Sequence, residues 1–191
     1  MLRPLHAISA FAIVMIASGA CSDPNALGNS TIENTLDSSV TLYSLATGPL
    51  TAPVAYSVNA RTAVRIFDVG TNFEFAFTMD STGKAVFLPL DVLGLAGGSS
   101  VKPGLVRSTS TFDAMTRAPL NGYVTSDTIP IAEQDRFYLR TGVNTCSALG
   151  VPLYAKLEIL DLDTVNSTVT MRVLADENCG YRGLGLGLPK S

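Results

Sequence analysis

The strongest pattern of apolar and polar positions in the chain lies between Tyr154 and Val173. Two runs, 154–160 and 168–173, alternate apolar and polar side chains with a period of two. Such a period is typical of a β-strand with one face on a core and the other in water. The apolar positions are Ala155, Leu157, Ile159, Val169, Met171 and Val173. The Asp, Asn and Ser residues of 161–167 indicate a turn, so the stretch predicts a half-buried β-hairpin.

Shorter runs of the same kind recur along the chain and are separated by Gly, Pro, Asn and Asp. They cover residues 39–47, 63–69, 73–77, 85–90, 123–125 and 136–140. Turn residues at 80–84 predict that 73–77 and 85–90 pair as a second hairpin. The segment 93–104 contains four glycines and a proline and predicts a loop, whereas 113–117 has room for one helical turn.

These patterns indicate the fold class. No run of twelve or more residues after residue 20 has a convincing helical period. Many short strands with turn residues between them are typical of antiparallel sandwiches and barrels. We therefore expect a single all-β domain over residues 34–180, built as an antiparallel β-sandwich or open barrel. A Gly-rich tail over residues 181–191 is expected to follow it.

Residues 1–20 have the composition of a targeting segment. Arg3 supplies a positive charge, and an apolar run of 13 residues extends from Leu5 to Ala17. A membrane-spanning helix needs about 20 apolar residues, so this run predicts a cleaved signal peptide. Small residues then precede Cys21 in an arrangement that resembles the lipobox of bacterial lipoproteins, although Ser18 stands where Leu, Val or Ile is usual.

The lipobox resemblance implies that Cys21 is lipidated, for example with palmitate, and becomes the mature N-terminus. The alternative is an ordinary secretory signal that is cleaved near the same position and leaves an unpaired thiol. Pro and Gly then interrupt regular structure, so residues 21–33 are expected to be the lipidated N-terminus and a flexible tether. By analogy with enterobacterial sorting, Ser22 favours the outer membrane. We expect a protein anchored in the bacterial envelope that faces the periplasm or the cell surface.

The charge of the chain limits its partners. The formal net charge is −3, and removal of Arg3 with the signal peptide makes it −4. A mildly acidic surface repels phosphate backbones, so nucleic acid is not an expected partner. The expected partners are the membrane, through the lipid, and another envelope protein.

Two cysteines, Cys146 and Cys179, lie on either side of the 154–173 hairpin. In an exported protein, such a pair most simply forms a disulfide bond. A metal site is the alternative, but it would need further ligands, and the chain after Cys21 has no other Cys and no His.

The residue inventory also argues against an enzyme. The only histidine is His6, within the expected signal peptide, so a Ser–His–Asp or Cys–His pair cannot be built in the usual way. Asp161 and Asp163 could hold Ca²⁺, but a hairpin turn is the favoured interpretation because no further ladder of oxygen ligands follows. We expect no catalytic residues and no metal site.

Several short motifs come in a recognisable order. They are Phe73–Phe77, Phe112-Asp113, Gly122-Tyr123, Phe137–Arg140 and Tyr154–Leu160. In order and spacing they resemble the HmuY-like family of bacterial outer-membrane lipoproteins, over about residues 66–173. The resemblance implies a mostly β fold and, because some members capture haem, a ligand-binding role. The chain departs from the family in Glu74, where Asp is commoner, in its cysteine pair, and in lacking the paired histidines of the haem carriers.

A haem role inherited from that family would need other ligands. Thioether sulfur is a known haem ligand, and Met79 and Met115 lie at a strand end and in a loop-like run. Arg117 could pair with a haem propionate. The alternative is that both methionines fill gaps in the core, which is the usual role of Met.

Together these observations predict a lipid-anchored, non-enzymatic interaction or structural module of the bacterial envelope. The alternative is an HmuY-like lipoprotein that binds a ligand, with haem as the candidate cofactor.

Overall fold

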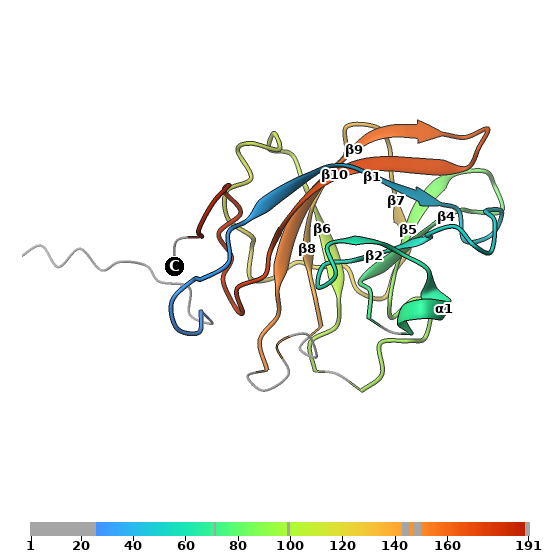
Figure 1. Cartoon of the computed structure of the whole chain (residues 1–191). Coiled ribbons are helices and arrows are strands. Elements are labelled where there is room, and N and C mark those ends of the chain that lie inside the picture. Colours follow the sequence, from blue (N-terminus) through green and yellow to red (C-terminus); the bar gives the residue numbers. More distant parts are fainter. Residues whose placement is uncertain (1–25, 71, 99, 143–145, 147–149, 190–191) are drawn as a thin grey trace, which may run out of the picture.

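The structure, a computed structural model, describes residues 26–189 except 71, 99, 143–145 and 147–149. The described strands form two antiparallel five-stranded sheets packed as a β-sandwich, which confirms the predicted fold class (Figure 1). The first sheet has the order β1 (Thr35–Tyr43), β10 (Thr168–Asp176), β9 (Tyr154–Asp163), β8 (Arg136–Arg140) and β6 (Gly104–Ser108). The second has the order β3 (Thr62–Val64), β2 (Ala55–Ser57), β4 (Phe75–Met79), β5 (Ala85–Pro89) and β7 (Ile129–Pro130).

The core lies between the two sheets and is rich in aromatic rings. Phe75 and Phe87, on neighbouring strands of the second sheet, have ring centroids 4.4 Å apart. Phe87 also meets Phe137 of the first sheet at 6.0 Å. The apolar residues of the central hairpin complete this core, and Leu157, Ile159, Val169, Met171 and Val173 are all buried. The sequence prediction for these five positions is therefore confirmed.

The central hairpin is β9 paired with β10. Leu157 faces Val173 and Ala155 faces Ala175 across the pair. A shift in register near Met171 makes Leu160 the extra residue, so the strict alternation ends there and Leu160 is exposed. The second predicted hairpin, β4 with β5, is also present, and Phe77 faces Phe87 in it.

One expectation about the central hairpin is wrong, because its outer face is not in water along its first half. Tyr154, Lys156 and Glu158 are all buried. Residues 112–118 and 181–184, which we call the cover, lie over Tyr154 and Lys156, whereas Glu158 pairs with Arg136 and Arg172. The two segments of the cover hydrogen-bond to each other where Ala118 N–H donates to the carbonyl of Arg182 (2.8 Å) and Leu184 N–H to that of Thr116 (2.8 Å).

Two other predicted strands differ from the observed elements. The run 63–69 ends as a strand at Val64 and continues as the single helical turn α1 (Ile66–Val69), in which Arg65 pairs with Asp68. This local pair and Gly70, with φ of 59°, favour a turn over an extended strand. The run 123–125 makes only an isolated bridge between Val124 and Leu105.

The expected tether and tail are joined to each other. Asn34 and Gly187 exchange backbone hydrogen bonds of 2.9 and 3.1 Å. Leu27 N–H donates to the carbonyl of Cys179, and the Tyr181 hydroxyl donates to the carbonyl of Gly28. Residues 27–33 and 181–189 therefore belong to the folded domain, which corrects the expected boundaries. The expected signal peptide and Cys21 lie outside the described residues.

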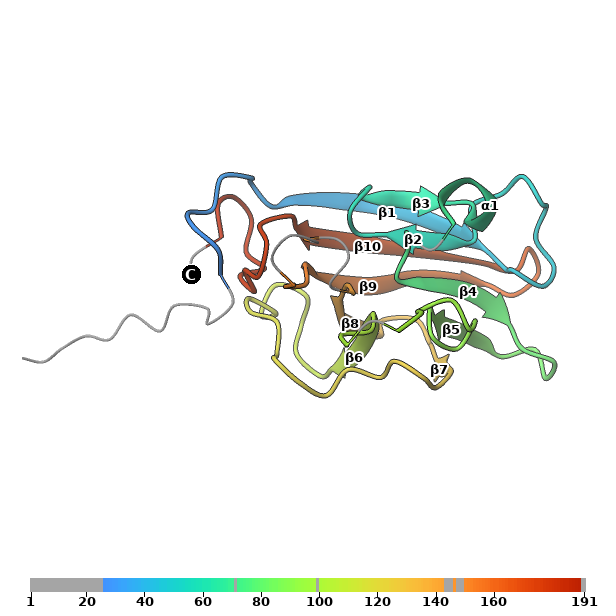
Figure 2. The same ribbon diagram turned by 90° about the horizontal axis from the view of Figure 1, so that it is seen from below.

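The sandwich has two opposite ends, which are formed by different segments of the chain. Residues 26–34 and 178–189 form what we call the terminal end. The loop 44–54, α1 and the turns at 80–84 and 164–167 form the loop end, and Figure 2 shows it on the opposite side of the molecule. The nine residues of β10 run from one end to the other, which corresponds to about 30 Å at the usual rise per residue.

Candidate functional site

At the loop end, two strongly exposed large apolar side chains line the same groove. Leu50 is 85% exposed and Phe67 is 87% exposed, and both line a hollow between the loop 44–54 and α1. The floor of the hollow includes Val54, which is buried. We call these residues, together with Leu45 and Ile66, the loop-end surface.

Backbone contacts hold the loop-end surface in shape. Gly48 N–H donates to the carbonyl of Ser44 at 2.7 Å, and Leu45 N–H donates to the carbonyl of Phe77 at 2.9 Å. A Cβ on Gly48 would lie 2.6 Å from the carbonyl oxygen of Ser44, so this close turn requires glycine. The exposed Leu50 and Phe67 are therefore presented by an ordered scaffold.

The size of the hollow indicates what it could accept. Its volume is about 40 Å³, whereas sites for drug-sized ligands and cofactors usually measure about 300–1,000 Å³. The hollow is large enough to seat part of one side chain and is flanked by large apolar groups. This arrangement is typical of a contact surface for another macromolecule rather than of a cofactor pocket.

A second candidate site is a polar cluster at the open edge between β1 and β3. Arg61 lies between two carboxylates, 3.9 Å from Asp37 and 3.9 Å from Glu177. The hydroxyl of Tyr56 is buried beside them without a hydrogen-bond partner. Burial and the nearby carboxylate of Asp37 raise the pKa of Tyr56 above its ordinary value.

Glu74 completes the polar cluster beneath β2. Its Oε2 accepts a hydrogen bond of 2.7 Å from Val58 N–H, and the side chain is buried. Burial raises the pKa of Glu74 to about 8, and the hydrogen bond from Val58 opposes that rise. Glu74 is therefore largely protonated at neutral pH, and it stabilises the structure as a neutral hydrogen-bonding group.

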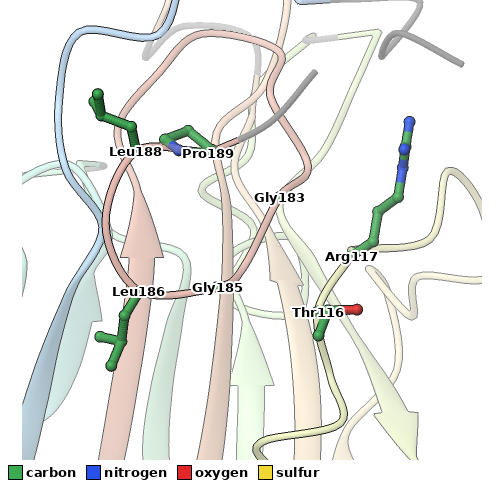
Figure 3. Close-up of a pocket in the computed structure, with 7 residues that line it drawn as sticks. All are labelled: Thr116, Arg117, Gly183, Gly185, Leu186, Leu188 and Pro189. Atoms are coloured by element: carbon green, nitrogen blue, oxygen red, sulfur yellow. The ribbon is translucent and has the colours of Figure 1, made fainter. Parts of the chain in front are cut away.

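A third hollow, of about 340 Å³, lies at the terminal end (Figure 3). One wall is the segment with Thr116 and Arg117, and the other is the C-terminal loop with Gly183, Gly185, Leu186, Leu188 and Pro189. Apart from Thr116 and Arg117 the lining is Gly, Leu and Pro, so the hollow has few polar side chains that could select a ligand.

The structure does not bring the proposed haem ligands together. Met115 belongs to the cover and its side chain is fully buried, and its carbonyl accepts a hydrogen bond of 3.1 Å from Lys156. Met79 lies at the loop end and lines an open hollow of about 630 Å³, whereas Arg117 lies at the terminal end. Met79 and Arg117 therefore lie at opposite ends of the sandwich and the Met115 side chain is buried, so the structure does not bring Met79, Met115 and Arg117 together.

The predicted disulfide bond between Cys146 and Cys179 is present, with Cα atoms 5.9 Å apart. It joins the segment before β9 to the segment after β10, as the sequence predicted. Nearby, Gly180 N–H donates to the carbonyl of Pro152 at 3.1 Å. Together these contacts fix the base of the central hairpin at the terminal end.

Two further findings concern metals and membrane spans. Within the described residues, no group of three or more His, Cys, Asp or Glu is placed to hold a metal ion. In the same part of the chain, no helix has the length and apolar character that a membrane crossing requires.

Sequence reasoning missed both the loop-end surface and the polar cluster. Phe67 was assigned to a strand, where its side chain would have been half buried. The polar cluster brings together residues 37, 56, 61, 74 and 177, which only the sheet topology places side by side. The charged pair Arg61 and Asp37 had no distinguishing spacing in the sequence.

Comparison with known proteins adds no relative, because no protein-family model, curated protein or solved structure matches this chain.

Proposed function

We propose that the chain is a lipid-anchored protein of the bacterial envelope that acts as a non-enzymatic interaction module and binds a partner protein through the loop-end surface. The observation that carries this proposal is the exposure of Leu50 and Phe67 around a small hollow on an ordered loop. The surface lies at the end opposite the segment that leads back to Cys21. A lipid on Cys21 would therefore leave the loop end turned away from the membrane.

The energetics favour a protein partner at this surface. Full burial of a Leu or Phe side chain contributes about 1.5–3 kcal/mol, and aromatic residues dominate the binding free energy of protein interfaces. The hydrogen bonds of Gly48 and Leu45 already order the loop, so binding would lose little conformational entropy there. A partner that inserts one apolar side chain between Leu50 and Phe67 fits this geometry.

Substitution of the exposed aromatic residue tests the proposal. The protein is purified in mild detergent from its native membrane as wild type, Phe67→Ser and Leu160→Ser. Leu160 is a matched control because it is an exposed leucine on β9 that does not line the hollow of the loop-end surface. We expect a stoichiometric envelope protein with the wild type and with Leu160→Ser, and its loss with Phe67→Ser.

The identified partner then allows a quantitative check. In a titration with purified partner, Phe67→Ala should weaken binding by about 2 kcal/mol or more, as truncation of an interface hot spot does. A partner that binds Phe67→Ala and Leu50→Ala as tightly as the wild type would place the interface elsewhere. Absence of any stoichiometric partner in the wild-type preparation would count against the interaction module itself.

A ligand-binding role of the HmuY-like kind is the second candidate. The hollow beside Met79, about 630 Å³ in volume, is the observation that favours it. In a haemin titration followed in the Soret band, a saturable one-to-one shift should weaken in Met79→Ala. Met115→Ala is the control, because its side chain is buried and should leave the shift unchanged. A titration without a saturable shift would reject this candidate.

A further inference from the structure

We propose that the terminal end rests on the membrane that holds the lipid anchor, with the side chains of Leu186 and Leu188 inserted among the lipid headgroups. The inference depends on the proposed lipidation of Cys21 and extends it. The anchor would then be one of two membrane contacts, and the protein would stand on the bilayer in a fixed orientation.

The length of the connection to Cys21 is the first argument. Cys21 is five residues before Ala26, where the described chain begins. Five residues span at most about 18 Å when fully extended. The next residue, Leu27, already donates a hydrogen bond to the carbonyl of Cys179 on the folded domain. A membrane that holds Cys21 must therefore lie close to the terminal end.

The composition of the terminal end is the second argument. Leu186 is 72% exposed and Leu188 is 52% exposed, although they stand in one short loop. Leu27 and Ile32 add two more exposed apolar side chains. Apolar residues that are gathered beside a lipid anchor are placed to enter the boundary between headgroups and acyl chains.

The leucine loop is also fixed to the segment that leads to the anchor. Gly187 exchanges two backbone hydrogen bonds with Asn34, and the Asn34 side-chain amide donates to the carbonyls of Gly183 (2.8 Å) and Gly185 (3.0 Å). The Ser30 hydroxyl donates to the carbonyl of Pro189 at 2.9 Å. These bonds on both sides of the two leucines hold the loop beside the connection to Cys21.

The charge at this end is mixed. Arg117 and Arg182 belong to the cover, and Glu33 lies on the N-terminal segment. Arginine would favour anionic lipid, whereas Glu33 would oppose it. The apolar side chains therefore carry the contact, and it should form on a zwitterionic bilayer as well.

Tryptophan fluorescence tests the orientation without background, because the chain contains no tryptophan. Leu188→Trp and Leu186→Trp report on the terminal end, and Leu50→Trp and Val165→Trp are matched controls at the loop end. Each lipoprotein is purified from its native membrane and placed in phosphatidylcholine vesicles with brominated acyl chains. We expect a blue-shifted emission and severalfold stronger quenching for residues 186 and 188 than for residues 50 and 165.

Other outcomes overturn the inference. Equal quenching at the two ends, or stronger quenching at the loop end, would contradict the orientation. A blue shift of Leu188→Trp that needs no vesicles and grows with protein concentration would assign the leucines to contact with a second copy of the chain.

A separate experiment tests whether Cys21 is lipidated, independently of the orientation. Mass spectrometry of the native N-terminal peptide shows whether Cys21 carries acyl chains. Where it does not, the proposed anchor fails. The same Trp variants, with the mature chain coupled through the free Cys21 thiol to maleimide lipid, then test the terminal-end surface alone. Weak quenching of residues 186 and 188 in that preparation would reject the surface as well.

Discussion

The contrast between Ile159 and Leu160 shows how the structure uses neighbouring residues of similar size. Ile159 is 1% exposed within the core, whereas Leu160 is 44% exposed after the shift in register. We expect Ile159→Ala to lower the free energy of unfolding by about 2–5 kcal/mol, from lost burial and the cavity that remains. Leu160→Ala should change it by less than about 0.5 kcal/mol. Urea denaturation measures both, and equal losses would contradict the assigned faces of β9.

Glu74 gives a pH dependence of stability. Its pKa is 4.5 in an unfolded chain and about 8 in the folded protein. The folded state therefore holds the extra proton between these values, so this group makes the free energy of unfolding fall as pH rises from 4.5 to 8. Glu74→Gln keeps a hydrogen-bond acceptor for Val58 N–H and should flatten that fall. A slope that persists in Glu74→Gln across the same range would assign the pH dependence to other groups.

Among the elements, the central hairpin shows why alternation in sequence was only partly informative. The pattern located both strands and the core face. It could not show that residues 112–118 and 181–184 cover the other face. Lys156 stays compatible with burial because its ammonium donates to the carbonyls of Phe112 (2.9 Å) and Met115 (3.1 Å) and lies 4.5 Å from the Phe112 ring centroid. The alternating pattern therefore assigned Lys156 to the solvent face, although its ammonium is buried with its hydrogen bonds made.

The disulfide bond stabilises the base of this hairpin. Cys146 and Cys179 are 33 residues apart. Closure of such a loop lowers the conformational entropy of the unfolded chain, which stabilises the folded state by about 3–4 kcal/mol. The double variant Cys146→Ser/Cys179→Ser should lose stability of that order in urea denaturation. Both proteins are compared in a Cys21→Ser background, which removes the proposed lipid anchor and leaves positions 146 and 179 as the only difference between them. An unchanged unfolding midpoint in the double variant would show that the bridge adds no net stability.

For the whole molecule, the sequence was sufficient for the fold class but not for the candidate site. The sandwich followed from period-two runs and turn residues, and the disulfide from a cysteine pair in a chain that the sequence predicts to be exported. The loop-end surface depends on the close turn at Gly48 and the helical turn after Arg65. Both conformations depend on local contacts that a hydrophobic pattern does not register, so Phe67 was placed in a strand.

The prediction of the domain boundaries from the sequence was inaccurate for a different reason. Gly, Pro and Asn in residues 27–33 and 181–189 predicted flexible ends. Each segment supplies the hydrogen-bond partners that the other lacks, as Asn34 does for Gly183, Gly185 and Gly187. Pairing between segments more than 140 residues apart in sequence has no local signal.

The mass of the N-terminal peptide from protein isolated from its native membrane tests the central proposal most directly. The account predicts that the peptide begins at Cys21 and carries acyl chains, and that Cys21→Ala moves the protein from the membrane to the soluble fraction. An unmodified N-terminus on a protein that is already in the soluble fraction would contradict it.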